Sequence, residues 1–172
     1  SGWGANQAMA FVIELVNGSG IRWVETYEGE AASAAKLHIN YTTATPTTVT
    51  AQISDSFDDA EEDTDDGQMH RTSSDLELMN DGNEEQVVGL RFASVNIPVG
   101  ATIADARLEF EIDEEHSESS DPITLLIHGE DQDSPGSYAS SSNDISNRTK
   151  TTANSTWAIT SNPAVNNALI SP

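Results

Sequence analysis

Short runs of alternating apolar and polar residues recur along most of the chain. The clearest lies in residues 106–113, where Leu108, Phe110 and Ile112 fall on one side and charged residues on the other. Residues 36–41 repeat the pattern with an apolar residue at every second position. Successive side chains of a strand point to opposite faces, so both runs predict strands with one buried face.

Further apolar runs predict more strands, separated by turn-forming or charged residues. They cover residues 9–16, 21–28, 49–57, 73–79, 86–95 and 122–130. The run at 9–16 is apolar on both sides, as in a central strand, and the following NGSG predicts a hairpin with 21–28. Residues 131–154 are rich in Ser, Asn and Asp and predict a long surface loop or an irregular edge. Roughly eight strands with one short helix indicate an all-β sandwich.

The two ends of the chain read as one continuous passage when the end is written before the start. Asn162 suits a helix N-cap and Pro163 the first helical position, and a Pro-Ser-Gly break then leads into the strand at 9–16. Val165, Leu169 and Ile170 share one face of this expected helix. The order predicts a repeat unit cut in a shifted frame, in which the end of one unit meets the start of the next. The residues expected at this inter-unit junction are Ser1, Gly2, Trp3, Phe11, Ile13, Leu169, Ile170 and Pro172.

A Thr- and Pro-rich stretch divides the chain. Residues 42–48 have no apolar anchor and predict an extended linker. We therefore expect residues 1–41 to be the C-terminal part of one sandwich module and residues 49–172 to be the N-terminal part of the next. Each sandwich would then be completed by a segment from a neighbouring repeat or subunit. The alternative is a single chain whose linker joins two strands of one sandwich, as in a circular permutant.

Acidity dominates the composition. The chain carries 29 Asp and Glu residues against seven Lys and Arg, a net charge of −22. Nucleic acid and anionic membrane surfaces would repel such a molecule, so neither is an expected partner. No apolar run approaches the roughly 20 residues of a membrane helix, and no insertion is expected. The acidity fits either a solvated surface or carboxylates gathered for Ca²⁺.

Several stretches together resemble a known group of modules. They read FDDAEED, LRFASVNIPVGATIADARLEFEID, LLIHGEDQ and AAKLHINY. The chain is similar to the tandem β-sandwich modules related to the DNRLRE group of bacterial extracellular proteins. The resemblance implies a jelly-roll-like sandwich akin to carbohydrate-binding modules, a place outside the cell or on its surface, and no catalytic activity of its own.

The densest acidic stretch is the candidate metal site. Ca²⁺ binds six to eight oxygen ligands, and the carboxylates at positions 58–62 crowd enough negative charge to favour a counterion over simple solvation. Neighbouring strands can add further ligands. The predicted calcium ligands are Asp58, Asp59, Glu61, Glu62, Asp75, Glu25 and Glu28.

Catalytic motifs are missing from the sequence. The four His residues show no H-E-x-x-H spacing, and there is no G-x-S-x-G elbow, so we expect no enzymatic activity. Trp23 and Trp157 are possible sugar-stacking residues, although tryptophans in a chain with few aromatics are more often core or interface anchors.

Two functions remain open. The first is a structural repeat or subunit of an extracellular filament, adhesin stalk or surface array. Such units would polymerise head to tail with copies of themselves through strand complementation, with calcium stabilising the fold. The alternative is a carbohydrate-binding module of a secreted polysaccharide-degrading or surface protein. The shifted frame favours the first, because a binding module is normally cut at its linker.

Overall fold

The computed structural model describes residues 4–43, 45–82, 84–113, 122–160 and 169–170. Within these ranges the chain consists of strands and one short helix. The elements are β1 (Gln7–Gly18), β2 (Arg22–Glu25), α1 (Tyr27–Glu30), β3 (Lys36–Thr42), β4 (Pro46–Gln52), β5 (Asp59–Asp63), β6 (Met69–His70), β7 (Asp75–Leu78), β8 (Asn80–Asp81), β9 (Glu84–Val95), β10 (Thr102–Glu111), β11 (Ile123–Glu130), β12 (Lys150–Ile159) and β13 (Leu169–Ile170). None of the described helical residues belongs to a segment long and apolar enough to cross a membrane.

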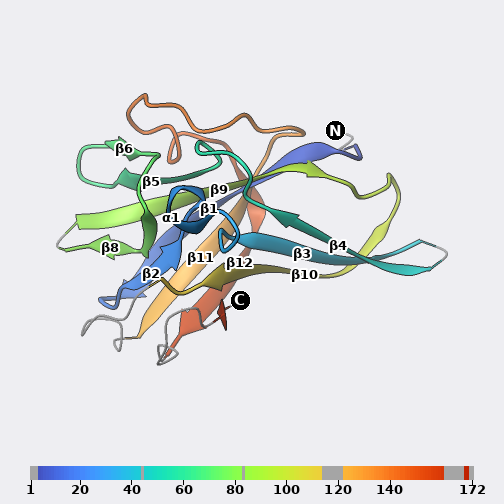
Figure 1. The fold of residues 1–172 in the computed structure, drawn as a ribbon, viewed down its shortest axis with the longest axis horizontal. Coiled ribbons are helices and arrows are strands. Elements are labelled where there is room, and N and C mark those ends of the chain that lie inside the picture. Colours follow the sequence, from blue (N-terminus) through green and yellow to red (C-terminus); the bar gives the residue numbers. More distant parts are fainter. Residues whose placement is uncertain (1–3, 44, 83, 114–121, 161–168, 171–172) are drawn as a thin grey trace.

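Two antiparallel sheets pack together as a sandwich (Figure 1). The larger sheet has the order β12-β11-β1-β9-β5-β6, and β8 also pairs with β9. The smaller sheet has the order β13-β10-β3-β4, and β2 pairs with β7 as a separate ribbon. The predicted all-β sandwich is confirmed at this level, and a jelly-roll arrangement stays a prediction.

The alternating runs build the interior between the sheets. In β3 the burial of side chains alternates residue by residue, and Leu37 and Ile39 are buried. In β10 Leu108 and Phe110 are buried in the same way. The ring of Phe110 stacks on Trp157 of β12, with 5.7 Å between ring centroids, and so joins the two sheets. Both predicted half-buried strands are confirmed.

Strand β1 is the central strand that its two-sided apolar pattern predicts. It pairs with β9 along one edge and with β11 along the other. Val12 and Ile13 point to opposite faces, and both are fully buried. Ile13 belongs to the sandwich interior, whereas Val12 lies beneath a loop on the outer face of the larger sheet.

The predicted hairpin between residues 9–16 and 21–28 is wrong. Strand β2 pairs with β7 instead, from Arg22 opposite Leu78 to Glu25 opposite Asp75. Because both edges of β1 are already occupied, the chain has to leave the larger sheet after Gly18. The strand predicted at residues 21–28 ends at Glu25. The next residue, Thr26, accepts a hydrogen bond from the Gly29 amide (3.0 Å) and is the N-cap of helix α1.

The helix expected from Asn162 falls largely outside the described residues. At its expected end, Leu169 and Ile170 form strand β13, which pairs with Glu111 and Phe110 of β10. These two residues therefore extend the smaller sheet and do not share a helical face. β13 pairs with one edge of β10, and β3 pairs with the other edge.

Residues 1–41 and 49–172 do not lie in separate modules in this structure. Their described parts share one core, in which Ile13 and Leu37 pack with residues of β9 and β11. The expected linker at 42–48 is the turn of the β3–β4 hairpin together with the first residues of β4, and Tyr41 lies opposite Thr47. Within the one chain described, both parts therefore contribute to the same sandwich. Exchange of segments between successive units stays a prediction.

Candidate functional site

The acidic stretch proposed as the metal site lies in and directly before a buried strand. β5 lies between β9 and β6, and all five of its residues are buried. The exposed fractions are 1% for Asp58, directly before the strand, 2% for Asp59 and Glu61, 1% for Glu62 and 6% for Asp63. Burying an ionised carboxylate costs several kcal/mol unless hydrogen bonds or opposite charges compensate. Each carboxylate must therefore have a partner, a proton or a cation.

Strand alternation divides these carboxylates between two faces. We call the side of β5 covered by residues 131–149 the loop face, and the side towards α1, β2 and β7 the helix face. Asp58 and Glu62 contact the loop, and Asp59 and Glu61 contact α1 and β7. The sequence predicts a single metal site formed by these carboxylates. Successive side chains of a strand point to opposite faces, however, so neighbouring carboxylates of β5 cannot bind the same ion.

On the loop face the carboxylates have ordinary donors. Asp58 accepts hydrogen bonds from Arg91 Nη1 (2.6 Å) and from Ser137 Oγ (2.8 Å). Glu62 Oε2 accepts from the backbone amides of Ile145 (2.7 Å) and Ser146 (3.0 Å). Such charge-assisted bonds are the stronger class of protein hydrogen bond. They fix the loop to the sheet.

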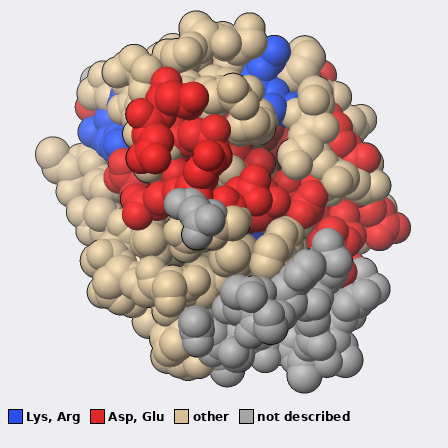
Figure 2. Space-filling view, turned by 90° about the vertical axis from the view of Figure 1, so that its left-hand side faces the viewer, with Lys and Arg blue, Asp and Glu red and all other residues tan. Residues whose placement is uncertain are grey.

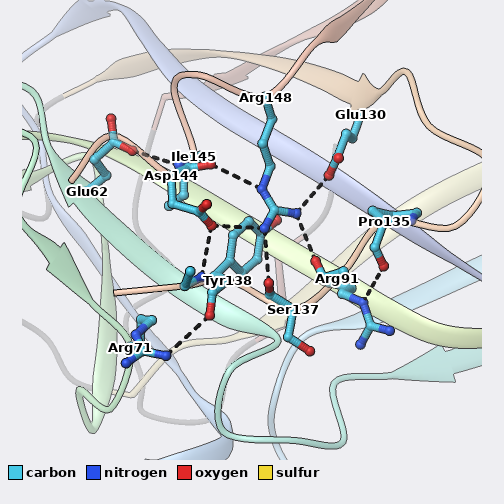
Figure 3. A network of polar contacts seen from close by, with 12 residues as sticks. Glu62, Arg71, Arg91, Glu130, Pro135, Ser137, Tyr138, Asp144, Ile145 and Arg148 are labelled. Carbon is cyan, nitrogen blue, oxygen red and sulfur yellow. Dashed lines mark hydrogen bonds and ion pairs between the residues drawn. The ribbon is translucent and has the colours of Figure 1, made fainter. Parts of the chain in front are cut away.

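Arg148 organises the rest of this loop (Figure 3). Its guanidinium binds Glu130 (2.8 Å) and Asp144 (2.9 Å) and lies 4.2 Å from the centroid of the Tyr138 ring. Tyr138 in turn packs directly on Gly89 of β9, where a Cβ atom would collide with the ring. This network holds the irregular segment that the sequence predicts between residues 131 and 149.

On the helix face hydrogen-bond donors are fewer. Asp59 Oδ2 accepts from the Tyr27 amide (2.9 Å), but its buried Oδ1 has no hydrogen-bond partner in the described part of the chain. Glu28 Oε1 is likewise buried there without a hydrogen bond. Burial raises the pKa of Asp59 to about 7, and the nearby Glu28 charge adds to the shift. Asp59 therefore keeps a proton at a higher pH than an ordinary aspartate does.

Two pairs of carboxyl groups lie close together on the helix face. Burial raises the pKa of Glu61 well above its usual range, and a side-chain hydrogen bond to Glu77 raises it further. Burial also raises the pKa of Glu25 to about 7, with a second contribution from its hydrogen bond to Asp113. Two carboxylates in contact cannot both stay ionised without a compensating charge. Each pair thus holds a proton or calls for a cation.

The predicted calcium ligands are only partly brought together. Asp58 and Glu62 belong to the loop face, where protein donors already satisfy them. Asp59, Glu61 and Glu25 lie on the helix face with Glu28 and Asp75 nearby, since those two charges raise the pKa of Asp59 and Glu61 respectively. Across the described ranges, no group of three or more His, Cys, Asp and Glu side chains is arranged to hold a metal.

The acidic surface continues outside the buried strand. Exposed acidic residues follow β5 and flank the β8–β9 turn: Asp65, Asp66, Asp81, Glu84 and Glu85. Figure 2 shows acidic side chains gathered in a band on the face that lies to the left in Figure 1. A surface of this kind attracts cations towards the helix face.

Several residues of this site were not foreseen. Glu77 and Asp113 complete the carboxyl pairs, and Arg91 and Ser137 hold Asp58. The sequence contains one signal for Glu77, because it alternates with the buried Leu76 and Leu78 in β7. The other three lie far from their partners in sequence and carry no local signal.

The predicted junction residues fall at different places in the fold. Phe11 and Ile13 lie in β1, and Leu169 and Ile170 lie in β13. Ser1, Gly2, Trp3 and Pro172 lie outside the described residues. The start of β1 and strand β13 are on different sides of the sandwich (Figure 1). Within the described residues the single chain does not bring these two elements together, and their contact between successive units stays a prediction.

The structure separates the two candidate sugar-stacking tryptophans. Trp157 is only 8% exposed and stacks on Phe110, so its ring is part of the core. A sugar cannot reach that stacked face without displacing Phe110, which rules against Trp157 as a platform. Trp23 is half-buried in β2 opposite Glu77.

A groove opens along the seam between the edges of β10 and β12. Its volume is about 400 Å³, and Phe11, Leu37, Leu108 and Ile127 contribute to its apolar lining. Arg107 and Asn154 are among the polar residues of its rim. We call this feature the seam groove.

Comparisons of this chain with protein-family models, with curated proteins and with solved structures gave no match.

Proposed function

We propose that this chain is a non-catalytic structural unit of an extracellular or cell-surface assembly. In the assembly, residues 1–41 of one unit complete the β-sandwich of its neighbour, and the units polymerise head to tail. The observation that carries the proposal is the position of the two long strands of this segment. β1 lies between β9 and β11, and β3 lies between β10 and β4.

The segment is integral to the core and has one connection to the rest. Its residues Ile13, Val24, Leu37 and Ile39 are almost completely buried, and burial of each such side chain contributes roughly 1.5–3 kcal/mol. Without this segment, residues 49–172 cannot bury the core side chains of β9, β10 and β11 that pack against it. Only the β3–β4 turn connects the segment to the later strands.

Exchange through such a turn needs no new contacts. If the β3–β4 hairpin opens, the segment can make the same contacts in a neighbouring copy, so the free energies of the closed and exchanged forms differ mainly at the hinge. Protein concentration then favours exchange. Because the segment enters one neighbour while the unit receives another segment, the assembly grows in one direction.

Calcium is the expected stabilising ion of the proposed unit. The unpartnered oxygens of Asp59 and Glu28 and the pairs Glu61–Glu77 and Glu25–Asp113 support a cation on the helix face. A divalent ion there would replace the protons that these carboxyl groups otherwise hold.

Carbohydrate binding is the second candidate function, and the seam groove favours it. An apolar lining with hydroxyl and amide groups on the rim suits a sugar ring. Saturable binding of an oligosaccharide, lost on substitution of Phe11 by Ala in a variant with unchanged melting temperature, would support this alternative.

Complementation between two full-length variants tests the proposed exchange. Ile13→Asp damages the segment and leaves the host strands intact, whereas Leu125→Asp damages the host and leaves the segment intact. Each side chain is fully buried, so neither variant should fold alone. Co-expression should yield a soluble heterodimer containing one intact sandwich. If both variants stay insoluble together, the segment does not exchange and the proposed function is wrong.

A further inference from the structure

Strand β12 lies at one end of the larger sheet. It pairs with β11 from Lys150 opposite Glu130 to Ile159 opposite Ile123. No described strand pairs with its outer edge, which ends the larger sheet on that side. Such an edge presents backbone N–H and C=O groups to any strand that approaches it.

The edge lacks the features that usually protect a free strand. Charged residues, prolines, bulges and short length discourage edge-to-edge pairing. β12 has ten residues, and its stretch Thr151–Thr156 contains no charge and no proline. The irregularity in its pairing with β11 lies between His128 and Glu130, near its first residue only.

The other sheet edges are better protected. β6, at the far end of the larger sheet, has two residues. In the smaller sheet β10 carries Asp105 and Arg107 and is partly covered by β13, and β4 begins with Pro46. Among the described edge strands, β12 thus has the longest stretch free of charge and proline, because Lys150 at its first position is its only charged residue.

Charge also favours this edge as a contact. Two copies that each carry −22 repel one another over most of their surfaces. Residues 145–172 contain no Asp or Glu, so all 29 acidic residues lie elsewhere in the chain. The nearby cations are neutralised within the chain, since Arg148 pairs with Glu130 and Lys150 pairs with Glu14.

We propose that β12 is a self-association edge, on which the β12 strand of a second copy pairs antiparallel about a twofold axis. The two larger sheets then become one continuous sheet. Antiparallel pairing of identical strands is self-complementary and closes as a dimer. Thr, Ser and Asn side chains directly opposite one another add favourable cross-strand contacts. The seam groove lies beside this edge, so the second copy also shields its apolar lining.

This contact goes beyond the head-to-tail exchange and does not depend on it. Exchange uses residues 1–41 and links units along a chain, whereas β12 pairing links two folded units, or two such chains, side by side. The first needs the β3–β4 hairpin to open, and the second needs no unfolding.

Sedimentation of the full-length protein with paired charge variants tests this inference. Asn154 and Thr156 are exposed on the outer side of β12, so Asn154→Glu with Thr156→Glu places repelling charges on the edge without entering the core. Thr48→Glu with Thr50→Glu adds the same charge to exposed positions of β4, another acid-free edge strand, and is the matched control. Melting curves check that all three proteins are folded.

We expect a reversible dimer for the unmodified protein that strengthens as NaCl rises from about 0.05 to about 0.5 M, because salt screens the repulsion. The β12 variant should weaken the dimer by about tenfold or more, and the β4 variant should change it much less. A monomer at both salt concentrations would overturn the inference. So would a dimer that survives the β12 substitutions or is lost equally in the control. An exchanged assembly would resist the β12 substitutions and separate only on unfolding, so the two forms of association are distinguished.

Discussion

The two faces of β5 carry the same kind of side chain with different numbers of hydrogen-bond donors around it. On the loop face, Asp58 and Glu62 accept hydrogen bonds from an arginine, a hydroxyl and two backbone amides. On the helix face, Asp59 and Glu61 have one amide each and lie close to other carboxyl groups. The carboxylates of the loop face therefore fix the loop to the sheet. On the helix face burial raises the pKa of Asp59 and of Glu61.

The comparison shows that burial alone does not determine what a carboxylate does. All four side chains are no more than 2% exposed. The supply of donors differs, because a polar loop folds over one face, whereas α1, β2 and β7 bring further carboxyl groups to the other. We expect four changes to affect the two faces differently, and the most damaging comes first.

Removing the loop-face cation should be the most damaging change. Arg91→Met leaves Asp58 buried with only the Ser137 hydroxyl as donor. Loss of one partner of a buried ion pair typically costs about 3–5 kcal/mol. We expect a loss of about 3 kcal/mol in the free energy of unfolding, measured by urea denaturation. The double variant Arg91→Met with Asp58→Asn should recover part of this loss. No recovery would mean that Arg91 acts through packing.

Weakening the loop anchor should have an intermediate effect. Glu62→Gln keeps an acceptor for the Ile145 and Ser146 amides but removes the charge that strengthens both bonds. We expect a loss of about 1–2 kcal/mol. Amide hydrogen exchange should show faster exchange at Ile145 and unchanged exchange at Leu125 in β11. Equal acceleration at both sites would contradict a local anchor.

Stability without calcium should fall as pH rises from about 4 to about 7. The pKa of Asp59 is about 7 in the folded protein and near the ordinary value of 3.8 when unfolded. Over this window the folded state binds more protons, so the free energy of unfolding decreases with rising pH and levels off above pH 7. One such group contributes a slope of at most about 1.4 kcal/mol per pH unit.

Asp59→Asn tests the origin of this slope. The amide cannot ionise, so the variant should show a shallower decrease between pH 4 and pH 7 and greater stability than the unmodified protein above pH 7. Asp58→Asn is the matched control on the loop face, and it should destabilise the protein near neutral pH. Identical pH profiles for Asp59→Asn and the unmodified protein would exclude Asp59 as the source.

Calcium should produce the smallest of the four effects. At pH 8, above the pKa of about 7 of Asp59 and of Glu25, we expect millimolar Ca²⁺ to raise the melting temperature by a few degrees through binding to the folded state. Asp59→Asn should reduce this increase, and Asp65→Asn, at an exposed position, should not. An unchanged melting curve in excess calcium and in chelator would contradict the proposed ion.

Local patterning was sufficient for some strands and insufficient for others. The alternation in β3 and β10 and the two-sided apolar run of β1 identified these strands, because neighbouring residues within each run decide its burial. The same approach missed β5. Its buried state depends on partners that are distant in sequence, such as the Ile145 amide, 83 residues from Glu62.

Competition for strand edges explains the wrong hairpin. The NGSG turn is suitable for a hairpin, but β9 and β11 already occupy both edges of β1, so β2 pairs with β7. The arrangement of the buried carboxyl groups was only partly predictable for a related reason. Composition identified the acidic stretch, but alternation along β5 and the approach of Glu77 decide which carboxylates converge.

A disulfide across β1 and β11 tests the proposed exchange most directly. Glu14 lies opposite Leu126 in this pair of strands, both are partly exposed, and the chain contains no cysteine of its own. The variant Glu14→Cys with Leu126→Cys therefore records which chain supplies β1 to each sandwich. If segments exchange, protein oxidised after assembly at high concentration should give a ladder of covalent dimers, trimers and longer species on a non-reducing gel. A single band of internally closed monomer at every concentration would contradict the exchange.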